Sequence, residues 1–521
     1  MTKLAVHSVA SRVIELLFAT FPSKFTSPLK LELYGPQYAL FANTNIPTTT
    51  TVVVDNTTVN TAAAAMTRQL LLPTLEEFVQ DHPNKREPTL VHIQSLVQKG
   101  LDKCLVGFAY FHALLHDYIT IASCDEIRSF LSPSLADHAL HLLSTRHGTR
   151  VVCDCLAYAT VRDRKRMLKC LRGYTRSSLL HRDAYLAILR ACDVMDDTVL
   201  VNKMLLAELH RNPVDDTKKK GMMVIGGSDT NDDDDDDDET KREEEEVETS
   251  PILDLVLSDT GSKLFLLLLV SKEEEVSTEH HLASKGVGND KATATATTLR
   301  WQKYFDPYEL SILHRNPTIT EKGEDGPVPT SKKADEIRRQ ELVAYLKELL
   351  LGVCTSHAKE ILRSKTGSRV LMEVCESYPS VEVYNAIVEA CCASTTNRGS
   401  DNDDVSLSMF EDPVGHMTLK NIFLSESKNN NDSHDDEDDD DEPTLARAFY
   451  SKFQIRLGEL AASNRGAFVL AALMGTCVGK EVRVALMDHK KDIAKLAIGG
   501  GKEKNKKLAG CGVLLELLKK K

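Results

Sequence analysis

The sequence predicts an all-α solenoid of stacked helical repeats, interrupted by disordered acidic loop insertions. Three observations predict it: a short phrase recurs along the 521 residues, apolar positions at helical spacing follow each copy, and polar low-complexity segments separate the helices. A phrase that recurs in this way is typical of a unit that stacks on copies of itself.

The recurring phrase is clearest at 146–152, 259–265 and 365–371, where Gly is followed by Thr or Ser, a cation and apolar residues. Fainter copies lie at 9–13, 182–186, 413–417 and 464–469. From Gly148 to Asp183 the step is 35 residues, which is the length of two helices and two turns. From Gly261 to Gly367 it is 106 residues, so we expect one hidden unit between these copies.

The phrase is interpreted as the start of a helix. Gly would allow the turn, and the Ser or Thr after it would accept a hydrogen bond from a free backbone N–H. After Arg150 the helical spacing predicts one buried stripe, formed by Val151, Val152, Cys155, Leu156 and Ala159. The helix dipole disfavours a cation in the first turn, so an anion or a base lying along this surface would explain the repeated Arg or Lys.

Between the phrases, clear helices are predicted at 336–353, 369–377, 446–460 and 467–474. Polar loops are predicted at about 43–67, 213–250, 275–300, 317–333, 396–412 and 426–443, and strand-like alternation is nearly confined to 50–59. We divide the chain into helical repeats at 1–330 and a second domain with further helical repeats at 331–521.

Acidic residues are concentrated in two tracts. Residues 228–248 carry a net charge of −12 and residues 432–442 carry nine acids and no Lys or Arg, so without them the formal charge of −13 becomes +8. The folded part is therefore mildly basic, which suits a polyanionic partner.

Other classes of protein are disfavoured. No apolar run reaches the roughly 18 residues of a membrane span and no secretory signal is present, so we expect a soluble intracellular protein. The twelve cysteines form no C-x-x-C pair and are interpreted as reduced thiols, mostly in helices. His112 and His116 could face one metal ion, but Ala113 stands where a zinc protease has Glu, so we predict no metal, no cofactor and no enzyme activity.

The Gly-[Ser/Thr]-Arg-Val phrases resemble the second helices of Pumilio (PUF) repeats. Segments 32–41, 163–166, 193–201, 338–342 and 463–467 resemble more closely the divergent nucleolar branch, the Pumilio homolog 3 family, which has a C-terminal CPL domain. The resemblance covers nearly the whole chain apart from the insertions. It places the CPL domain within 331–521.

The resemblance implies an L-shaped monomer that binds RNA, including double-stranded nucleic acid, with little sequence preference. It further implies a nucleolar and nuclear location, work on pre-rRNA and pre-60S ribosomal particles, no membrane attachment, and in some members translational regulation through mRNA. The chain departs from the family by beginning inside the repeat array and by carrying acidic insertions. These are interpreted as solvated, disordered spacers or, as the alternative, as phosphate mimics that cover the basic face and weaken binding.

In sequence-reading PUF repeats, two residues of one helix hydrogen-bond to a base edge and the residue between them stacks on the base. Ser11, Arg12 and Glu15 match such a set, whereas Cys153, Leu266 and Met372 occupy the last position elsewhere. We therefore expect cations to contact phosphates without a sequence code. The residues predicted to bind RNA are Ser11, Arg12, Glu15, Thr149, Arg150, Tyr185, Ser262, Lys263, Ser368, Arg369, His416 and Arg465.

A second hypothesis stays open at this point. An armadillo- or HEAT-like solenoid could bind protein along its concave face, with the acidic loops as contacts. The cations could equally be solvated side chains on capped helices.

Overall fold

A computed structural model describes residues 1–36, 38, 74–211, 250–272, 275–280, 294–314, 316–320, 326–393, 409–432, 443–498 and 508–519. Outside these residues lie the predicted loop at 43–67 with its strand-like segment 50–59, residues 396–408 of the predicted loop at 396–412, and the acidic tract at 228–248. So does nearly all of the tract at 432–442.

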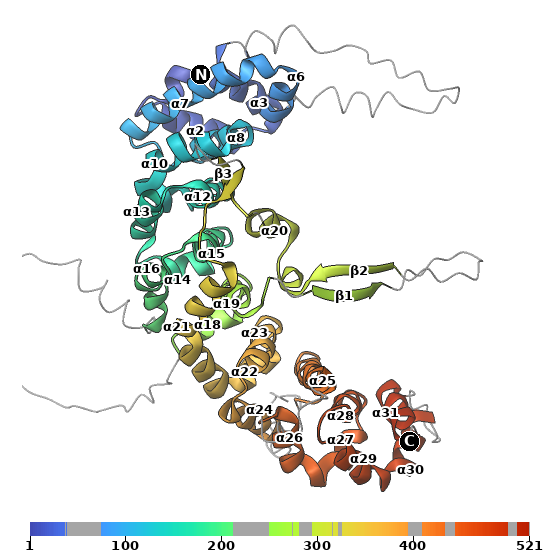
Figure 1. The fold of residues 1–521 in the computed structure, drawn as a ribbon. Coiled ribbons are helices and arrows are strands. Elements are labelled where there is room, and N and C mark those ends of the chain that lie inside the picture. Colours follow the sequence, from blue (N-terminus) through green and yellow to red (C-terminus); the bar gives the residue numbers. More distant parts are fainter. Residues whose placement is uncertain are drawn as a thin grey trace, which may run out of the picture. The chain divides into compact units, whose positions relative to one another are not determined.

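The chain divides into two compact units, each discontinuous in sequence. Unit 1 comprises Met1–Leu205 and Asp306–Arg338, and unit 2 comprises Leu206–Phe305 and Arg339–Lys521. Helices dominate both units, and the prediction of an all-α solenoid is confirmed (Figure 1). The domain boundary drawn at residue 330 stays a prediction.

Unit 1 is built from short helices. They are α1 (Thr2–Ala5), α2 (Ser11–Thr20), α3 (Ser23–Leu31), α6 (Leu75–Asp81), α7 (Arg86–Asp102), α8 (Ala109–Ile121), α9 (Cys124–Glu126), α10 (Ser132–Leu135), α11 (Ala139–Leu142), α12 (Arg146–Tyr158), α13 (Val161–Leu171), α14 (Thr175–Leu180), α15 (Tyr185–Val194), α16 (Thr198–Met204) and α20 (Pro307–Leu313). A π-helical turn, Ile127–Leu131, lies between α9 and α10.

Unit 2 contains the remaining helices. They are α18 (Leu253–Leu257), α19 (Ser262–Leu269), α21 (Asp335–Ser356, its first turn in unit 1), α22 (Ala358–Arg363), α23 (Lys365–Ser377), α24 (Val381–Ala393), α25 (Gly415–Asp432), α26 (Leu445–Phe453), α27 (Leu457–Ala461), α28 (Asn464–Leu473), α29 (Gly479–Met487), α30 (Lys490–Ile498) and α31 (Ala509–Lys519). A 3₁₀ helix, Arg300–Tyr304, precedes α20 in the chain.

The helix predictions hold with local exceptions. The segments expected at 336–353, 369–377 and 467–474 lie in α21, α23 and α28, but 446–460 is divided between α26 and α27 by a 3₁₀ turn at Gln454–Arg456. α25 also continues to Asp432, into a segment predicted to be a loop.

Two antiparallel hairpins lie where only loops were predicted. β1 (Glu275–His280) pairs with β2 (Ala294–Leu299), and β3 (Thr318–Thr320) pairs with β4 (Pro327–Pro329). Residues 294–298 are all Ala or Thr, small side chains with little to bury, so no apolar pattern pointed to a strand. The geometry of the first hairpin follows from antiparallel backbone pairing from Glu275–Leu299 to His280–Ala294 and from the preference of Thr for strands.

One row of helices runs through each unit, and we call its members the stacking helices. In unit 1, α8 packs on α12 and α12 on α15; in unit 2, successive contacts join α19, α23, α25, α28 and α31. Because α23 packs directly on α18 and α19, the hidden repeat predicted between Gly261 and Gly367 is wrong. The intervening residues instead supply the hairpins, the 3₁₀ helix, α20, α21 and α22.

The Gly of each phrase is a point of close approach to the preceding helical turn. A Cβ on Gly148, Gly261 or Gly466 would collide with the backbone carbonyl oxygen of the residue six positions earlier, at 2.8 Å for Gly261 and 2.5 Å for Gly466. Gly367 faces Ile361 at 3.2 Å, again six positions earlier. The described phrase glycines do not have positive φ, so the phrase needs Gly for space rather than for a turn.

The residue that caps these helices differs from the predicted one, which was the Ser or Thr after the Gly. The side chain three residues before the Gly accepts the hydrogen bond from its N–H, rather than the Ser or Thr after it. The acceptors are Thr145 (3.1 Å to Gly148), Ser258 (3.3 Å to Gly261), Ser364 (3.1 Å to Gly367), Asp412 (2.8 Å to Gly415) and Ser463 (2.9 Å to Gly466). Three of these helices, α12, α23 and α28, consequently begin two residues before the Gly.

The predicted apolar stripe of α12 is confirmed. Val151, Val152, Cys155, Leu156 and Ala159 are all at most 2 % exposed. Among the described residues, no helix combines the length and apolar character needed to cross a membrane.

A buried carboxylate joins α25 to α26. Glu426 accepts hydrogen bonds from the backbone N–H groups of Leu445 (2.7 Å) and Ala446 (3.2 Å), the first residues of α26. Burial outweighs these two hydrogen bonds and raises the pKa of Glu426 to about 7.

The close approach at Gly466 makes it intolerant of a side chain. We expect Gly466→Ala to lower the free energy of unfolding by roughly 2 kcal/mol or more, because the new methyl overlaps the carbonyl oxygen of Leu460. Gly352→Ala in the same unit is the control, since nothing lies within 4 Å of its Cβ position in α21. It should gain up to about 1 kcal/mol from helix propensity. Equal effects in urea unfolding would contradict the packing role of Gly466.

The raised pKa of Glu426 makes the stability of unit 2 depend on pH. The folded state keeps a proton that the unfolded chain releases near its ordinary pKa of 4.5, so stability falls as pH rises from about 4.5 to about 7. Glu426→Gln lacks this dependence and should gain about 3 kcal/mol relative to the parent over that interval. Urea unfolding of both proteins at pH 5 and pH 7.5 measures it, and parallel curves would exclude it.

Candidate nucleic-acid interface

Most of the residues predicted to bind RNA lie in the first turns of the stacking helices, and Ser11, Arg12 and Glu15 lie on α2. The structure brings Lys263 on α19 and Arg369 on α23 onto neighbouring helices of unit 2. Both side chains are partly exposed. They are the pair that best retains the predicted arrangement of cations.

The predicted polar side chains beside these cations are buried. Ser11, Thr149, Ser262, Ser368, Tyr185 and His416 are all at most 9 % exposed. The hydroxyl of Ser262 donates to the carbonyl of Asp259 (3.3 Å), and that of Ser368 donates to the carbonyl of Lys365 (3.0 Å). Side chains buried in this way do not reach a base edge, and their role in RNA binding stays a prediction.

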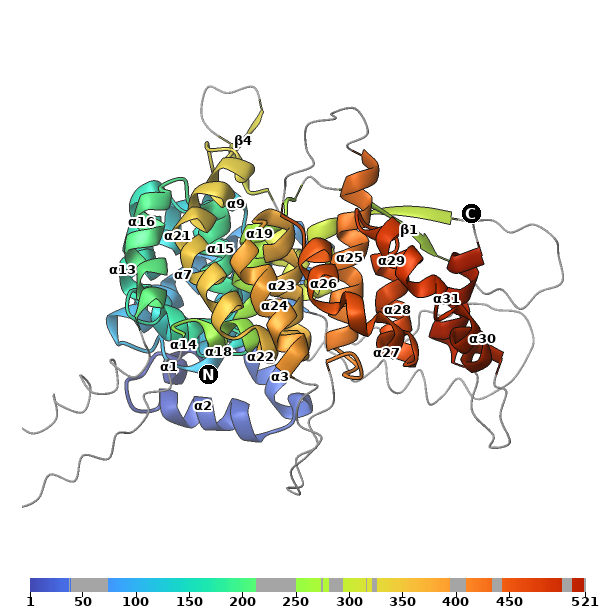
Figure 2. The same cartoon turned by 90° about the horizontal axis from the view of Figure 1, so that it is seen from below.

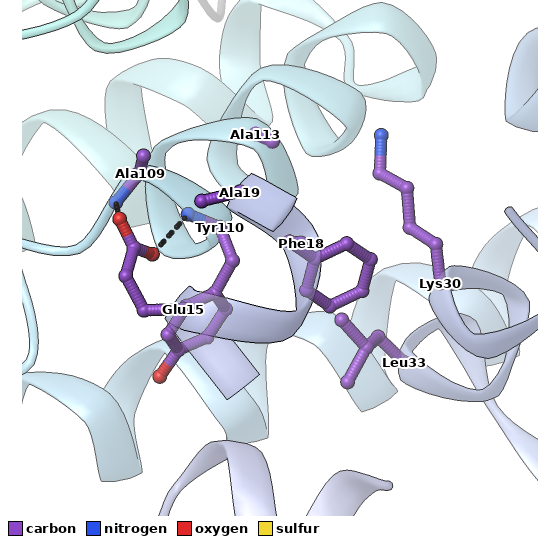
Figure 3. A pocket seen from close by; sticks show the side chains of 8 residues that line it. All are labelled: Glu15, Phe18, Ala19, Lys30, Leu33, Ala109, Tyr110 and Ala113. Atoms are coloured by element: carbon purple, nitrogen blue, oxygen red, sulfur yellow. Dashed lines mark hydrogen bonds between the residues drawn. The ribbon is translucent and has the colours of Figure 1, made fainter. Parts of the chain in front are cut away.

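Glu15, predicted to read a base, instead caps a helix. Its carboxylate accepts hydrogen bonds from the backbone N–H groups of Ala109 (3.0 Å) and Tyr110 (3.1 Å) at the start of α8 (Figure 3). These contacts close one side of a mostly apolar pocket whose lining includes Phe18 and Leu33. Ser11 is likewise engaged, with the carbonyl of Ser8 at 3.4 Å, so the one matching set of base-reading residues is not available as a set.

In unit 1, α20 covers the stacking helices α12 and α15. Arg150 donates from Nε to Asp154 (2.9 Å) and from Nη1 to Ser311 of α20 (2.8 Å). The Arg146 guanidinium lies 3.8 Å from the ring centroid of Tyr308, also on α20. Arg150 was predicted to meet phosphate, and here its charge is paired within the chain.

Tyr185 is held in the same contact. Its hydroxyl donates to the carboxylate of Glu309, which is fully buried on α20. The segment that covers these residues lies more than 100 positions later in the chain, which is why the local pattern around Tyr185 gave no sign of it.

A similar cover lies on α23 in unit 2. Arg300 of the 3₁₀ helix forms ion pairs with Glu373 (2.7 Å) and Glu376, and the Tyr304 hydroxyl donates to Glu373. Glu373 and Glu376, in the C-terminal half of α23, are therefore paired with the 3₁₀ helix, while Arg369 nearer the start of α23 keeps partial exposure.

The remaining predicted cations differ in accessibility. Arg12 on α2 is exposed. Arg465 donates to the carbonyl of Glu411, and His416 contacts the carbonyl of Asp412 at 2.7 Å. Arg12 is exposed and Lys263 and Arg369 are partly exposed, so each can approach a phosphate, and their role stays a prediction.

The two histidines considered for a metal ion do not form a site. The ring nitrogens of His112 lie 2.8 Å from the Thr145 hydroxyl and 2.5 Å from the Val106 carbonyl, and burial lowers its pKa. His112 thus supports the cap of α12. No cluster of three His, Cys, Asp or Glu side chains suited to a metal ion occurs among the described residues.

The sequence interpretation missed a basic surface on α13. Arg162, Lys165 and Lys169 are exposed at spacings of three and four residues, and exposed Arg172 follows directly after the helix. The spacing of three and four residues between these cations indicates one exposed helix face, whereas 163–166 enters the sequence interpretation only through the family resemblance.

Comparison with known proteins agrees with the predicted resemblance. The family model described as the CPL (NUC119) domain matches residues 298–434. The human protein Pumilio homolog 3 is 21% identical over 420 residues, covering 79% of this chain and 51% of the relative. Pumilio homology domain family member 6 of Schizosaccharomyces pombe is 25% identical over 401 residues, covering 77% and 47%. The chain spans about half the length of the curated relatives it matches.

Solved structures support the fold. The crystal structure of human Puf-A matches with a TM-score of 0.64 and 19% identity, covering 99% of this chain and 77% of that chain. Human Puf-A in complex with DNA matches with a TM-score of 0.63, also at 19% identity. The predicted resemblance to the Pumilio homolog 3 family, with its CPL domain, is thereby confirmed.

Because α20 covers Tyr185, we expect its hydroxyl group to contribute to the free energy of unfolding and not to RNA affinity. We expect Tyr185→Phe to cost about 1–3 kcal/mol, since it removes a donor from a buried carboxylate, and to leave RNA affinity unchanged. Tyr174→Phe is the control: the Tyr174 side chain is 46 % exposed, and its variant should unfold like the parent. Thermal unfolding and RNA titration measure both effects. A loss of RNA affinity at unchanged stability would place Tyr185 back in the interface.

Proposed function

We propose that this protein binds RNA with little sequence preference and without catalysis, as a nucleolar factor in pre-rRNA processing and assembly of the large ribosomal subunit. Similarity to Pumilio homolog 3 over 79% of the chain supports the class of function. The complex of human Puf-A with DNA shows a nucleic acid bound by a protein of the same fold. Binding of mRNA in translational regulation is a further part of the proposal.

The observation that carries the proposal is the pair of cations on adjacent stacking helices, Lys263 on α19 and Arg369 on α23. Cations presented at repeated positions of stacked helices suit a phosphate backbone, whose charges also repeat. Arg12 provides a third such cation on α2 of unit 1.

Little sequence preference follows from what lies beside these cations. Ser262 and Ser368, which would have to read base edges, are buried, and each hydroxyl donates to the backbone carbonyl three residues earlier. Phosphate contacts position a nucleic acid but carry no sequence information directly. The same arrangement therefore favours binding of the RNA backbone over recognition of its base sequence.

A non-catalytic role fits the state of the thiols. Burial raises the pKa of Cys153 and of Cys354 to about 12, so both are protonated at neutral pH. A thiol is a strong nucleophile only as the thiolate, and these buried groups are held by packing.

We test the proposal with Arg12→Ala, Lys263→Ala and Arg369→Ala combined in one variant. Unrelated single- and double-stranded RNAs should bind the parent with similar affinity and a steep salt dependence. The variant should show a slope of log K against log salt that is smaller by about 2, because each phosphate that a cation neutralises on a single strand adds roughly 0.7 to the slope. Electrophoretic shift series at several salt concentrations measure it.

The control variant is Arg150→Ala, whose cation is paired with Asp154 and contacts Ser311. It should keep the parent's salt slope. RNA binding that is weak and independent of salt, together with tight binding of a protein partner, would instead support the protein-binding scaffold. In cells, the tagged parent should sediment with large-subunit precursors in the nucleolus, and a purely cytoplasmic tag would contradict that part of the proposal.

A further inference from the structure

The solvent face of α13 in unit 1 carries cations and no exposed acid. Arg162, Lys165 and Lys169 are exposed, as is Arg172 at the end of the helix, while Asp163 and Arg164 are buried. We call Arg162, Lys165, Lys169 and Arg172 the α13 basic row. Successive members are three or four residues apart, so they are neighbours along one side of the helix.

Most of the basic row has no counter-charge within the chain. Lys165 lies 3.5 Å from Asp197 in an exposed pair, which contributes little. Arg162, Lys169 and Arg172 have no ion-pair partner among the described residues. Arg166, on the flank of the row, is instead tied to Asp137 and Asp163.

The row is electrostatically unfavourable for the free protein. Each neighbouring pair of like charges destabilises a helix by about 0.2–0.5 kcal/mol, and Arg162 also opposes the positive end of the helix dipole. An anion with several charges lying along the row would relieve all of these repulsions together. A single small ion would relieve only one of them.

An exposed aromatic ring follows the row. Tyr174 is 46 % exposed and lies two residues after Arg172, in a turn where Gly173 has φ of +84°. Gly tolerates this left-handed conformation at little cost, and the ring that follows it lies outside the core. Exposed aromatic rings beside cations are how proteins stack unpaired bases while holding the phosphates.

The row is distinct from the surface used in the proposed function. α13 contacts α11 and α16, whereas α20 contacts α12 and α15. In Figure 1, α12 and α15 lie between α13 and α20, and both Figure 1 and Figure 2 show α13 at the edge of unit 1. No inserted segment covers the row among the described residues, since its four cations are all exposed.

Resting on the RNA binding of the proposed function, we propose that the α13 basic row and Tyr174 form a second RNA-binding surface, which takes a single-stranded segment through its phosphates and one unpaired base. The length of the row, about 15 Å at 1.5 Å per residue, accommodates several consecutive phosphates. Base identity is not read there, because a ring stacks on any base. An RNA that also occupies the stacking-helix surface would be held at two places.

The test replaces the row by Arg162→Gln, Lys165→Gln, Lys169→Gln and Arg172→Gln in one variant of the full chain. Its matched control carries Lys99→Gln, Lys359→Gln, Lys452→Gln and Lys480→Gln, four exposed lysines whose loss changes the net charge equally. With unpaired RNA, the row variant should show a salt slope smaller by up to about 3, and the control should keep the parent slope.

Tyr174 gives an independent readout. Tyr174→Ala should weaken binding of unpaired RNA roughly tenfold and leave binding of duplex RNA nearly unchanged, whereas Tyr174→Phe, which keeps the ring, should bind like the parent. Circular dichroism checks that each variant is folded, and the exposed positions make folding of all of them the expected result.

The outcomes separate this inference from the proposed function. If the row variant matches its control while the Arg12, Lys263 and Arg369 variant loses its slope, the second surface is excluded and the proposed function stands. If neither variant loses slope, both fail. If polyglutamate binds the parent but not the row variant, while RNA binds both equally, the partner of the row is an acidic polypeptide and the inference is overturned.

Discussion

The close approach of a helix start to the carbonyl oxygen six residues before it sets the geometry of this protein. Gly466, packed 2.5 Å (Cβ position) from the oxygen of Leu460, has no room for a methyl group. The cap three residues before the Gly satisfies one N–H of the same turn, as Ser463 does at 2.9 Å. Tight packing and capping together fix the start of such a helix against the helical turn that precedes it in the chain, as α28 is fixed against α27, while the stack itself is made by contacts such as that of α25 with α28.

The stack leaves a face that inserted segments then occupy. In unit 1, α20 pairs with Arg150 through Ser311 and with Tyr185 through Glu309. In unit 2, the 3₁₀ helix pairs Arg300 with Glu373. Both segments fall within or beside residues 298–434, which the CPL (NUC119) model matches. For the proposed function, a sequence-reading surface would need Arg150 and Tyr185 uncovered, so this cover fits contacts with phosphates rather than with bases.

The distribution of charge along the chain also suits a polyanionic partner. The two acidic tracts account for the negative net charge, and the described helices carry exposed cations in rows, most clearly on α13. A chain with a bulk charge of −13 thus presents local surfaces suited to a polyanion. The sign of a protein's net charge is a poor guide to the charge of its partner when acidic and basic residues are segregated along the sequence.

The sequence by itself determined the all-α stack, the buried stripe of α12 and the family resemblance, because helical periodicity and a repeated phrase are local properties. It misplaced the caps, since a Gly followed by Ser or Thr also fits a helix start, and it missed hairpins formed by backbone pairing. Only the tertiary structure decided which cations are covered: Arg150 donates a hydrogen bond to Ser311, 161 positions later in sequence, while Lys263 keeps partial exposure. Pairing over such separations depends on how segments return to the stack, and no local pattern encodes that return.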